Sequence, residues 1–367
     1  MVTSNIVIPW AKPAIDKEER RAALKVIDSG WMTQGKVTES LEKEICKKMK
    51  CKHAVVTSNG TTALICALIA NGIGPGDEVI VPSFTFIASV NSIISVGAKP
   101  VLVDSDPHTF NTTPELVRKK ITSKTKAIMP VDVAGMPVDI DAFQDLAKTK
   151  KIILLEDAAE AMGASYKNKK IGSFGHTAVF SFHIAKIAAG IEGGVVVTND
   201  KKIADLIKLI RSHGDTGGYN SVQFGLNFRT SDIHSAIALE QMKKIGNFVS
   251  HRMKLASVYK DELKDFKFQI IPDYVSCHPY MLFAILVDPH IRNKVNEFLN
   301  KNGVETRICW RPVHKQKCHA NKFETTGFSG ADAIYSRIIN LPMGNGLSEK
   351  EVMKVSILMK KAVQKYQ

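Results

Sequence analysis

The chain has 367 residues, of which 44% are hydrophobic and 23% charged, a balance ordinary for a globular enzyme long enough for two domains. Its formal net charge of +14 fits either a nucleic-acid binder or a protein that takes anionic ligands. The lysines lie in short scattered clusters without interleaved aromatic residues, so the pattern favours anionic small substrates and no nucleic-acid partner.

Three further features predict a soluble, cytoplasmic protein. The six cysteines include no CxxC pair, which is typical of reduced thiols, and no four-ligand spacing predicts a metal site. The N-terminal segment lacks the basic and apolar regions of a signal peptide. No apolar stretch reaches the about 18 residues that a membrane span needs, so no membrane contact is expected.

Residues 16–28 and 37–50 are expected to form helices, the first capped by Asp16. After them, short β-type runs alternate with helical segments. This alternation predicts an α/β fold, with a mostly parallel sheet covered by helices on both faces and ligands beyond the carboxyl ends of its strands. The strands are expected at 54–57, 78–81, 100–103, 125–130 and 152–155, and the helices at 63–70, 87–96, 114–121 and 140–148.

The segment Thr177–Asp200 is the one around which the rest of the chain is organised. Two β-type runs, 178–180 and 195–198, flank Lys186 and a Glu-Gly-Gly triplet, which predicts two strands joined by a tight turn. Apolar neighbours would hold the lysine partly buried, and desolvation of its amine favours the nucleophilic form that makes a Schiff base. Taken alone, the pattern also fits a surface lysine in a hairpin loop.

The sequence beyond these strands predicts a smaller α+β unit. We place the division near Gly246, giving a large domain of residues 1–245 and a small C-terminal domain of residues 246–367. The large domain is expected to end with helices at 201–211 and 233–245. In the small domain, helices are expected at 251–263, 292–302 and 349–364, and strands at 281–287 and 305–308.

Several expected strand ends carry residues suited to one site. The turn 58–62 before helix 63–70 would present free N–H groups to a phosphate, although helix capping explains it equally well. Phe86 follows another strand, and Asp157 closes strand 152–155 as either an N-cap or a ligand partner. A phosphate cradle, an aromatic ring, a carboxylate and a lysine are the groups that a pyridoxal phosphate site requires.

Here the sequence resembles the DegT/DnrJ/EryC1/StrS family of nucleotide-sugar aminotransferases, which have fold type I. The resemblance covers nearly the whole chain and is carried by ordered motifs: SGWMTQGK (29–36), TSNGTTAL (57–64), GPGDEVIVPSFTF (74–86), VGAKPVLVDSDP (96–107), LEDAAEAMGA (155–164), FSFHIAK and EGG (180–194), NFRTSDIHSAIAL (227–239) and NLPM (340–343).

The resemblance implies a role for each matching residue. Lys186 would bind pyridoxal 5'-phosphate as a Schiff base and then transfer protons as the catalytic acid and base. Asp157 would pair with the pyridine nitrogen of the cofactor, and Phe86 would stack on its ring. The phosphate would be bound by Gly60, Thr61 and Ser181.

The family also shares its active site between two subunits, which implies a homodimer. Either Asn227 or Arg229 would complete the phosphate site of the neighbouring subunit, and the sequence does not choose between them. His183 either lines the substrate site or packs as a structural residue. Glu160 stands where Gln or His often contacts the cofactor, a replacement similar to the subgroup acting on 4-keto sugars.

Other positions extend or depart from the family pattern. Asp132 stands where histidine is frequent, and Ile191 replaces the first glycine of GEGG. Arg307, Arg311 and His314 of the small domain are candidates to contact the diphosphate or sugar of a substrate, since a guanidinium fork suits phosphate oxygens.

The expected activity is transfer of an amino group, from L-glutamate, to a keto carbon of a nucleotide-linked deoxysugar. The 4-keto position is favoured, and the nucleotide (UDP, dTDP or GDP) stays open. Alternatives are a pyridoxal-dependent sugar dehydratase, in which histidine replaces the lysine, and an inactive homologue of the same fold that serves regulation or a pathway scaffold. Retention of Lys186 argues against the first, and its retention with Asp157 and Ser181 argues against the second.

Overall fold

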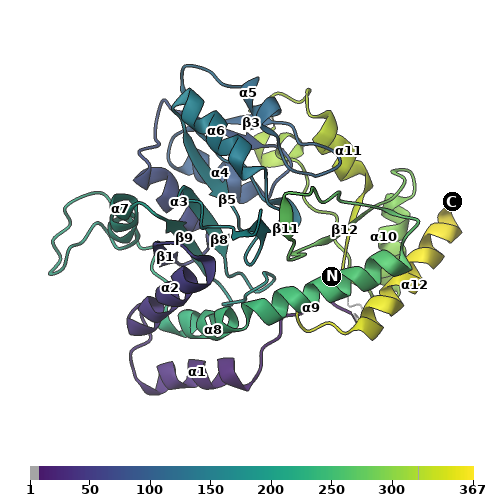
Figure 1. Cartoon of the computed structure of the whole chain (residues 1–367), viewed down its shortest axis with the longest axis horizontal. Coiled ribbons are helices and arrows are strands. Elements are labelled where there is room, and N and C mark those ends of the chain that lie inside the picture. Colours follow the sequence, from purple (N-terminus) through teal and green to yellow (C-terminus); the bar gives the residue numbers. More distant parts are fainter. Residues whose placement is uncertain (1–7, 321) are drawn as a thin grey trace.

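The computed structural model describes residues 8–320 and 322–367. Its centre is a seven-stranded sheet in the order β1-β9-β8-β5-β4-β2-β3 (Figure 1). The prediction that the N-terminus is no signal peptide concerns mainly residues 1–7, which lie outside the described residues. The strands of the sheet are β1 (His53–Thr57), β2 (Glu78–Pro82), β3 (Lys99–Val103), β4 (Thr125–Ile128), β5 (Ile153–Asp157), β8 (Thr177–Ser181) and β9 (Gly194–Thr198).

Helices cover both faces of this sheet, so the predicted α/β architecture is confirmed. β2, β3, β4, β5 and β8 pair in parallel, whereas β9 runs antiparallel to β8 and β1. The helices are α1 (Lys17–Asp28), α2 (Lys36–Met49), α3 (Gly60–Ala70), α4 (Ile87–Ser95), α5 (Pro114–Arg118), α6 (Ile140–Lys150), α7 (Lys201–Arg211), α8 (Asp232–Lys243), α9 (Ile245–Glu262), α10 (Arg292–Lys301), α11 (Ser329–Arg337) and α12 (Glu349–Tyr366).

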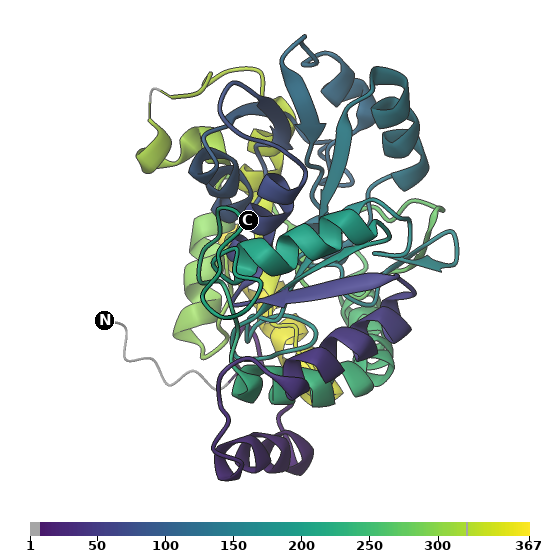
Figure 2. The ribbon, with the colours of Figure 1, turned by 90° about the vertical axis from the view of Figure 1, so that its left-hand side faces the viewer.

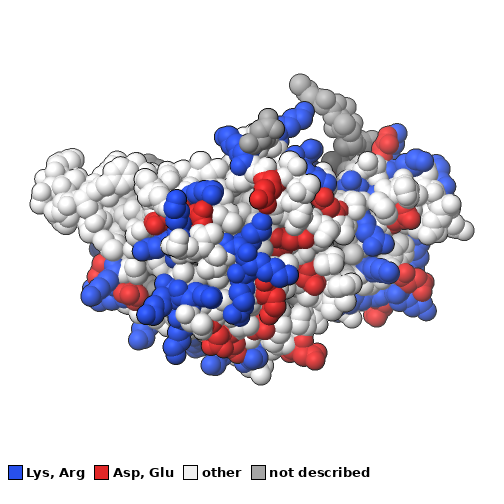
Figure 3. Space-filling model, turned by 90° about the horizontal axis from the view of Figure 1, so that it is seen from above, with Lys and Arg blue, Asp and Glu red and all other residues white. Residues whose placement is uncertain are grey.

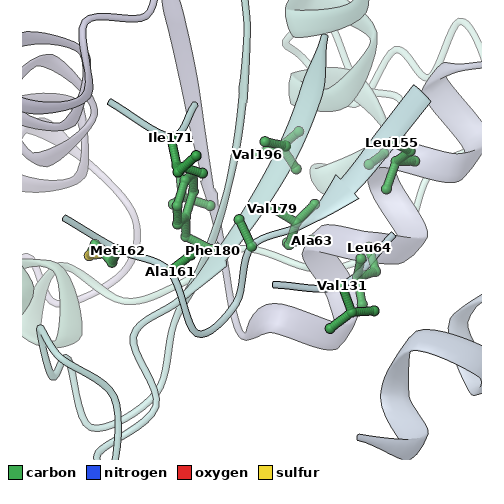
Figure 4. Packing of buried hydrophobic residues seen from close by; sticks show 14 of the residues in the cluster. Ala63, Leu64, Val131, Leu155, Ala161, Met162, Ile171, Val179, Phe180 and Val196 are labelled. Carbon is green, nitrogen blue, oxygen red and sulfur yellow. The ribbon is translucent and has the colours of Figure 1, made fainter. Parts of the chain in front are cut away.

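The main core forms because the central strands are apolar on both faces. On one face, Ala63 and Leu64 of α3 pack beside Val179 and Val131 (Figure 4). On the other face, α5 and α6 cover β2, β4 and β5 with a separate apolar cluster that includes Phe143. Burial on both sides holds the sheet rigid, and its carboxyl-end residues are therefore held in fixed positions.

A second apolar core lies under α9, α10 and α12, at the right of Figure 1. It is backed by a three-stranded sheet of β10 (Lys267–Phe268), β12 (Phe283–Leu286) and β13 (Ile338–Leu341). We propose on this basis that residues 246–367 form the smaller unit. The boundary is not clean, because the start of α9 and much of α11 pack into the main core.

Three local predictions were wrong. Helix α9 begins at Ile245, earlier than the expected residue 251, so it follows α8 almost directly. Residues 305–308 make isolated bridge contacts, through Arg307 with Asn340, and form no strand. The link between β8 and β9 is the loop 182–193 and not a tight turn, although Phe182 N–H donates to the Gly193 carbonyl at 2.8 Å and prolongs the hairpin.

A second small sheet joins β11 (Val275–Cys277), β6 (Ser165–Tyr166) and β7 (Lys169–Lys170). The view in Figure 2 shows α7 in front of the sheet, with the loop that follows it, and α1 standing apart at the bottom. Within the described parts of the chain, no helix combines the length and apolar character needed to cross a membrane.

Candidate active site

A pocket of about 800 Å³ opens at the carboxyl ends of the central strands. This is the place that the sheet topology predicts for a ligand. The residues that line it include many of those singled out in the sequence: Gly60, Thr61, Phe86, Asp157, Glu160, Ser181, His183, Lys186 and Arg307.

The first turn of α3 forms one wall of the pocket. Asn59 caps this helix, because its Oδ1 accepts the N–H of Thr62 at 2.9 Å, so the preceding N–H groups of Gly60 and Thr61 have no partner within the helix. A Cβ added at Gly60 would lie 3.3 Å from Cβ of Ser181, so glycine is what lets the strand end approach the helix. The N–H groups and the hydroxyl together form a cradle suited to an anion.

Lys186 lies in the loop 182–193, and its side chain is 15% exposed. Its Nζ is 3.2 Å from Oε1 of Glu160, whose Oε2 accepts the N–H of Ala134 at 2.8 Å. The lysine is therefore partly buried, as expected. It also faces a carboxylate, which the prediction of apolar neighbours did not include. Glu160 fixes the direction in which the amine points.

Asp157 ends β5 and is buried at the floor of the pocket. Burial raises the pKa of its carboxyl, and the hydrogen bonds that it accepts oppose that rise. Ser89 Oγ donates to Oδ2 at 2.7 Å, and the N–H of Ala159 donates to Oδ1 at 3.2 Å. Thr85 Oγ1 lies 2.8 Å from Ser89 Oγ and extends the chain of hydroxyls.

Aromatic residues surround the mouth of the pocket. Phe86 is 51% exposed, and its ring centroid lies 5.0 Å from that of Trp310 at an angle of 59°. The guanidinium of Arg307 lies 6.0 Å from the ring of Trp10 and pairs with Glu305. One positive charge among flat rings suits a ligand that carries both an anionic and a planar part.

The model of the DegT/DnrJ/EryC1/StrS aminotransferase family matches residues 13–360. The chain belongs to this family. As a member it is a pyridoxal-phosphate-dependent aminotransferase, which confirms the predicted class of enzyme and its cofactor.

Solved structures of DegT/DnrJ/EryC1/StrS-type fold agree over almost the whole chain. PseC of Helicobacter pylori, an aminotransferase involved in the biosynthesis of pseudoaminic acid, is 30% identical, with 98% of this chain and 99% of that chain covered and a TM-score of 0.92. Spr1654 from Streptococcus pneumoniae, assigned as a sugar aminotransferase and solved in its PLP form, is 27% identical over 98% and 99% of the chains, with a TM-score of 0.94. A 3-amino-5-hydroxybenzoic acid synthase is 27% identical over 98% and 99%, with a TM-score of 0.91.

The pocket fits the cofactor of this aminotransferase family. The glycine cradle at Gly60 has the shape and the N–H donors for a phosphate, and Asp157 offers a buried carboxylate for a pyridine nitrogen. The exposed ring of Phe86 can cover a flat aromatic ligand, and Lys186 lies in the same pocket to bind its carbonyl carbon. When bound, pyridoxal phosphate supplies the electron-withdrawing ring that the side chains lack.

Several residues predicted for the site lie outside this pocket. Asn227 and Arg229 do not line it. Nor does Arg311, whose Nε donates to the Lys315 carbonyl at 2.8 Å. His314 is buried away from the pocket, with its Nδ1 2.7 Å from the hydroxyl of Ser83.

The surroundings of His314 give it a structural role. Its Nε2 lies 3.1 Å from Oδ1 of Asp332, and its ring stacks on Phe328 with centroids 4.5 Å apart. Burial lowers the pKa of the imidazole, against the attraction of Asp332. His183 does line the pocket, where its Nε2 is 3.9 Å from Oε1 of Glu192.

Ser89 is a positioning residue that the sequence did not reveal, and its replacement makes a direct prediction. Ser89→Ala removes the hydroxyl donor to Asp157, which raises the pKa of that carboxyl further and weakens its hold on the pyridine nitrogen. A hydrogen bond to a charged group contributes about 1.5–3 kcal/mol, so we expect cofactor binding at least about tenfold weaker. Titration of the apoprotein with pyridoxal phosphate, followed by absorbance, measures it.

The matched control is Ser92→Ala, in the same helix. Ser92 is equally buried, but its hydroxyl donates to the Ser89 carbonyl at 2.9 Å and does not reach Asp157. An equal loss of cofactor affinity in both variants would assign the effect to α4 as a whole and contradict the role of Ser89.

Proposed function

We propose that this enzyme transfers an amino group from L-glutamate to a keto carbon, C4 by preference, of a nucleotide-linked deoxysugar, in the biosynthesis of a surface polysaccharide, a glycan or an antibiotic sugar. The observation that carries the proposal is the mouth of the pocket, where the guanidinium of Arg307 lies 6.0 Å from the Trp10 ring and Trp310 lines the same pocket. A guanidinium suits a diphosphate, and indole rings suit a base or a sugar face. The similarity to PseC and Spr1654 supports a sugar acceptor.

The roles of the side chains follow from their positions. The cradle of Gly60, Thr61 and Ser181 binds the phosphate, which fixes the cofactor in register with Lys186. Asp157, kept in place by Ser89, holds a proton on the pyridine nitrogen. Lys186 carries a proton between neighbouring atoms of the bound substrate, and Glu160 directs its Nζ toward them. Phe86 and Trp310 shield the reacting atoms from water.

The acceptor can be identified from the absorption of the bound cofactor. L-Glutamate is expected to bleach the visible band of the purified enzyme, and the true acceptor to restore it. Keto sugars linked to UDP, dTDP and GDP, each as the 3-keto and the 4-keto form, are to be compared with a cyclic non-sugar ketone. Because one similar structure is a 3-amino-5-hydroxybenzoic acid synthase, recovery of the band only with a cyclic non-sugar ketone would refute the sugar proposal.

The loop after α7 supports a homodimer with shared sites. It protrudes at the left of Figure 1, and the corresponding end of Figure 3 shows no charged side chains. Tyr219 at its tip is 100% exposed, and Val222 and Phe224 are largely exposed. Asn227 and Arg229 lie just beyond this loop and outside the pocket of their own chain. We place the apolar loop against a second copy, whose phosphate site one of these two residues completes.

Mixing two inactive variants tests the shared site. Lys186→Ala chains and Asn227→Ala/Arg229→Ala chains, refolded together, can form heterodimers with one intact site. At equal mixing, random pairing makes about half of the dimers heterodimers, and each heterodimer has one intact site of its two. We therefore expect recovery of roughly a quarter of the wild-type activity per chain. Mass photometry confirms that dimers form. Dimers without recovered activity would contradict sharing. The cytoplasmic location stays a prediction.

A further inference from the structure

Behind the active site, a second acidic group is buried on the opposite side of the sheet. Glu156 precedes Asp157 in β5, so its side chain points away from the pocket, as alternate residues of a strand do. Asp132 follows β4, and its backbone N–H donates to the Asp157 carbonyl at 3.1 Å. Asp132 is 0% and Glu156 is 1% exposed. Nothing in the mechanism above uses either carboxyl.

The neighbouring hydrogen bonds indicate which ring nitrogen of His176 donates to Glu156. Gln144 Nε2 lies 3.2 Å from the Phe174 carbonyl, which makes this atom the donor, and 3.2 Å from Nδ1 of His176. Nδ1 therefore accepts, and the ring proton is on Nε2, which donates to Oε2 of Glu156 at 2.9 Å. His176 therefore gives Glu156 one hydrogen bond, through Nε2.

The remaining oxygens of the two carboxyls lack any donor. Asp132 Oδ1 accepts the N–H of Val138 at 3.0 Å, whereas Asp132 Oδ2 and Glu156 Oε1 are buried with no donor among the described residues. Val131 and Asp157 are parallel bridge partners, so the side chains of Asp132 and Glu156, one position from each, lie on the other face of the sheet as neighbours on adjacent chain segments. Two ionised carboxylates in that position would repel without compensation, whereas one proton between them makes a strong hydrogen bond.

We infer that Asp132 and Glu156 share one proton in the folded protein at neutral pH, so that the pair presents one negative charge, and not two, behind Asp157. Burial and the charges of Glu156 and Asp157 all raise the pKa of Asp132 well above its ordinary value. Tyr274 is also near Asp132: burial is the main cause that raises the pKa of its phenol, and the charges of Asp139 and Asp132 add to the rise. His176 also faces the pair, through its contact with Glu156.

The shared proton matters for the cofactor site because Asp157 is already difficult to ionise. Burial raises the pKa of Asp157, and a second negative charge nearby would raise it further. A protonated Asp157 cannot hold a proton on the pyridine nitrogen. Asp132 and Glu156 are therefore positioning residues that keep Asp157 ionised. This role rests on the pyridoxal phosphate site, whereas the shared proton itself does not.

Infrared difference spectra of the apoprotein test the proton directly. In Asp132→Asn the new amide N–H donates to Glu156. In Glu156→Gln the new amide N–H donates to Asp132, and the amide oxygen accepts from His176. Each variant therefore keeps the hydrogen bonds of the pair. At pH 7 each difference from wild type should show the loss of one carbonyl band of a protonated acid. Asp141→Asn is the control, since Lys167 lowers the pKa of Asp141 and it carries no proton. If the variants are folded and their difference spectra from wild type contain only bands of ionised carboxylates, the inference is overturned.

Two pH profiles extend the test. The folded wild type retains a proton that unfolded Asp132 releases above its ordinary pKa of about 3.9, so stability is lost as pH rises toward the raised pKa. Relative to either amide variant, the unfolding constant of wild type should rise about tenfold per pH unit above pH ~5. If the unfolding constants of wild type and of the amide variants change in parallel with pH, the pair shares no proton.

With cofactor bound, the visible absorption band of the wild type should show a step at alkaline pH where the pair loses its proton. This step should be absent in Asp132→Asn and present in Asp141→Asn. An unchanged titration would remove the proposed effect on Asp157, even with the infrared band present. Failure to bind pyridoxal phosphate at all would count against the active site and not against the shared proton, which the apoprotein measures.

Discussion

Replacing Lys186 by alanine is expected to abolish aminotransfer while leaving the fold intact. Among residues 8–320 and 322–367 the side chain has one polar contact, with Glu160, and it lies in a loop, so little packing is lost. The variant lacks both the amine that binds the cofactor and the group that moves the proton. Loss of a positioned acid–base group alone costs up to about 10⁴-fold, so we expect at least that reduction. The rate of cofactor bleaching by L-glutamate in a single turnover measures it.

Lys186→Arg keeps the positive charge of the side chain but removes the reactive amine. Arginine keeps the ion pair with Glu160 but stays protonated, so it neither binds a carbonyl carbon nor accepts a proton. Both variants should therefore be inactive, and their melting temperatures should match that of wild type. Lys201→Ala, at an exposed lysine of α7, is the matched control and should react normally. Activity within tenfold of wild type in either Lys186 variant would exclude Lys186 as the catalytic residue.

Much of the fold was predictable because its signals are local. Each parallel strand is a short apolar run between helical segments, and the cap residues Asp16 and Asn59 fix where two helices begin. The order of residues at the strand ends then placed Phe86, Asp157 and Lys186 in one site, since parallel strands end at the same edge.

What could not be predicted depends on contacts between distant segments. Ser89 reaches Asp157 across 68 positions of sequence, and Trp10 meets Arg307 only after the chain has folded. The segment 305–308 has strand-like composition, yet it pairs through a single bridge, because composition does not determine which backbone is available to it. His314 was a candidate to contact the diphosphate or sugar, and only its contacts with Ser83 and Asp332 show that it is buried away from the pocket.

Asp157→Asn is expected to bind the cofactor but to lose most of the reaction rate. The amide is the same size and can still accept from Ser89, so the pocket keeps its shape. It has no charge to hold a proton on the pyridine nitrogen. A unit charge at about 4 Å in a site of effective dielectric about 20 contributes about 4 kcal/mol, which corresponds to roughly a 10³-fold slower reaction.

The pH profile gives this prediction its own signature. Because the pKa of Asp157 is raised, the wild-type rate should fall on the acid side as this carboxyl takes up a proton, and recover as pH rises through its pKa. Asp157→Asn has no such group, so its slow rate should lack that acid limb. Ser89→Ala, which removes an opposing hydrogen bond, should move the limb to higher pH. An acid limb that is identical in all three proteins would belong to another group, and Asp157 would then have to be ionised throughout the measured range.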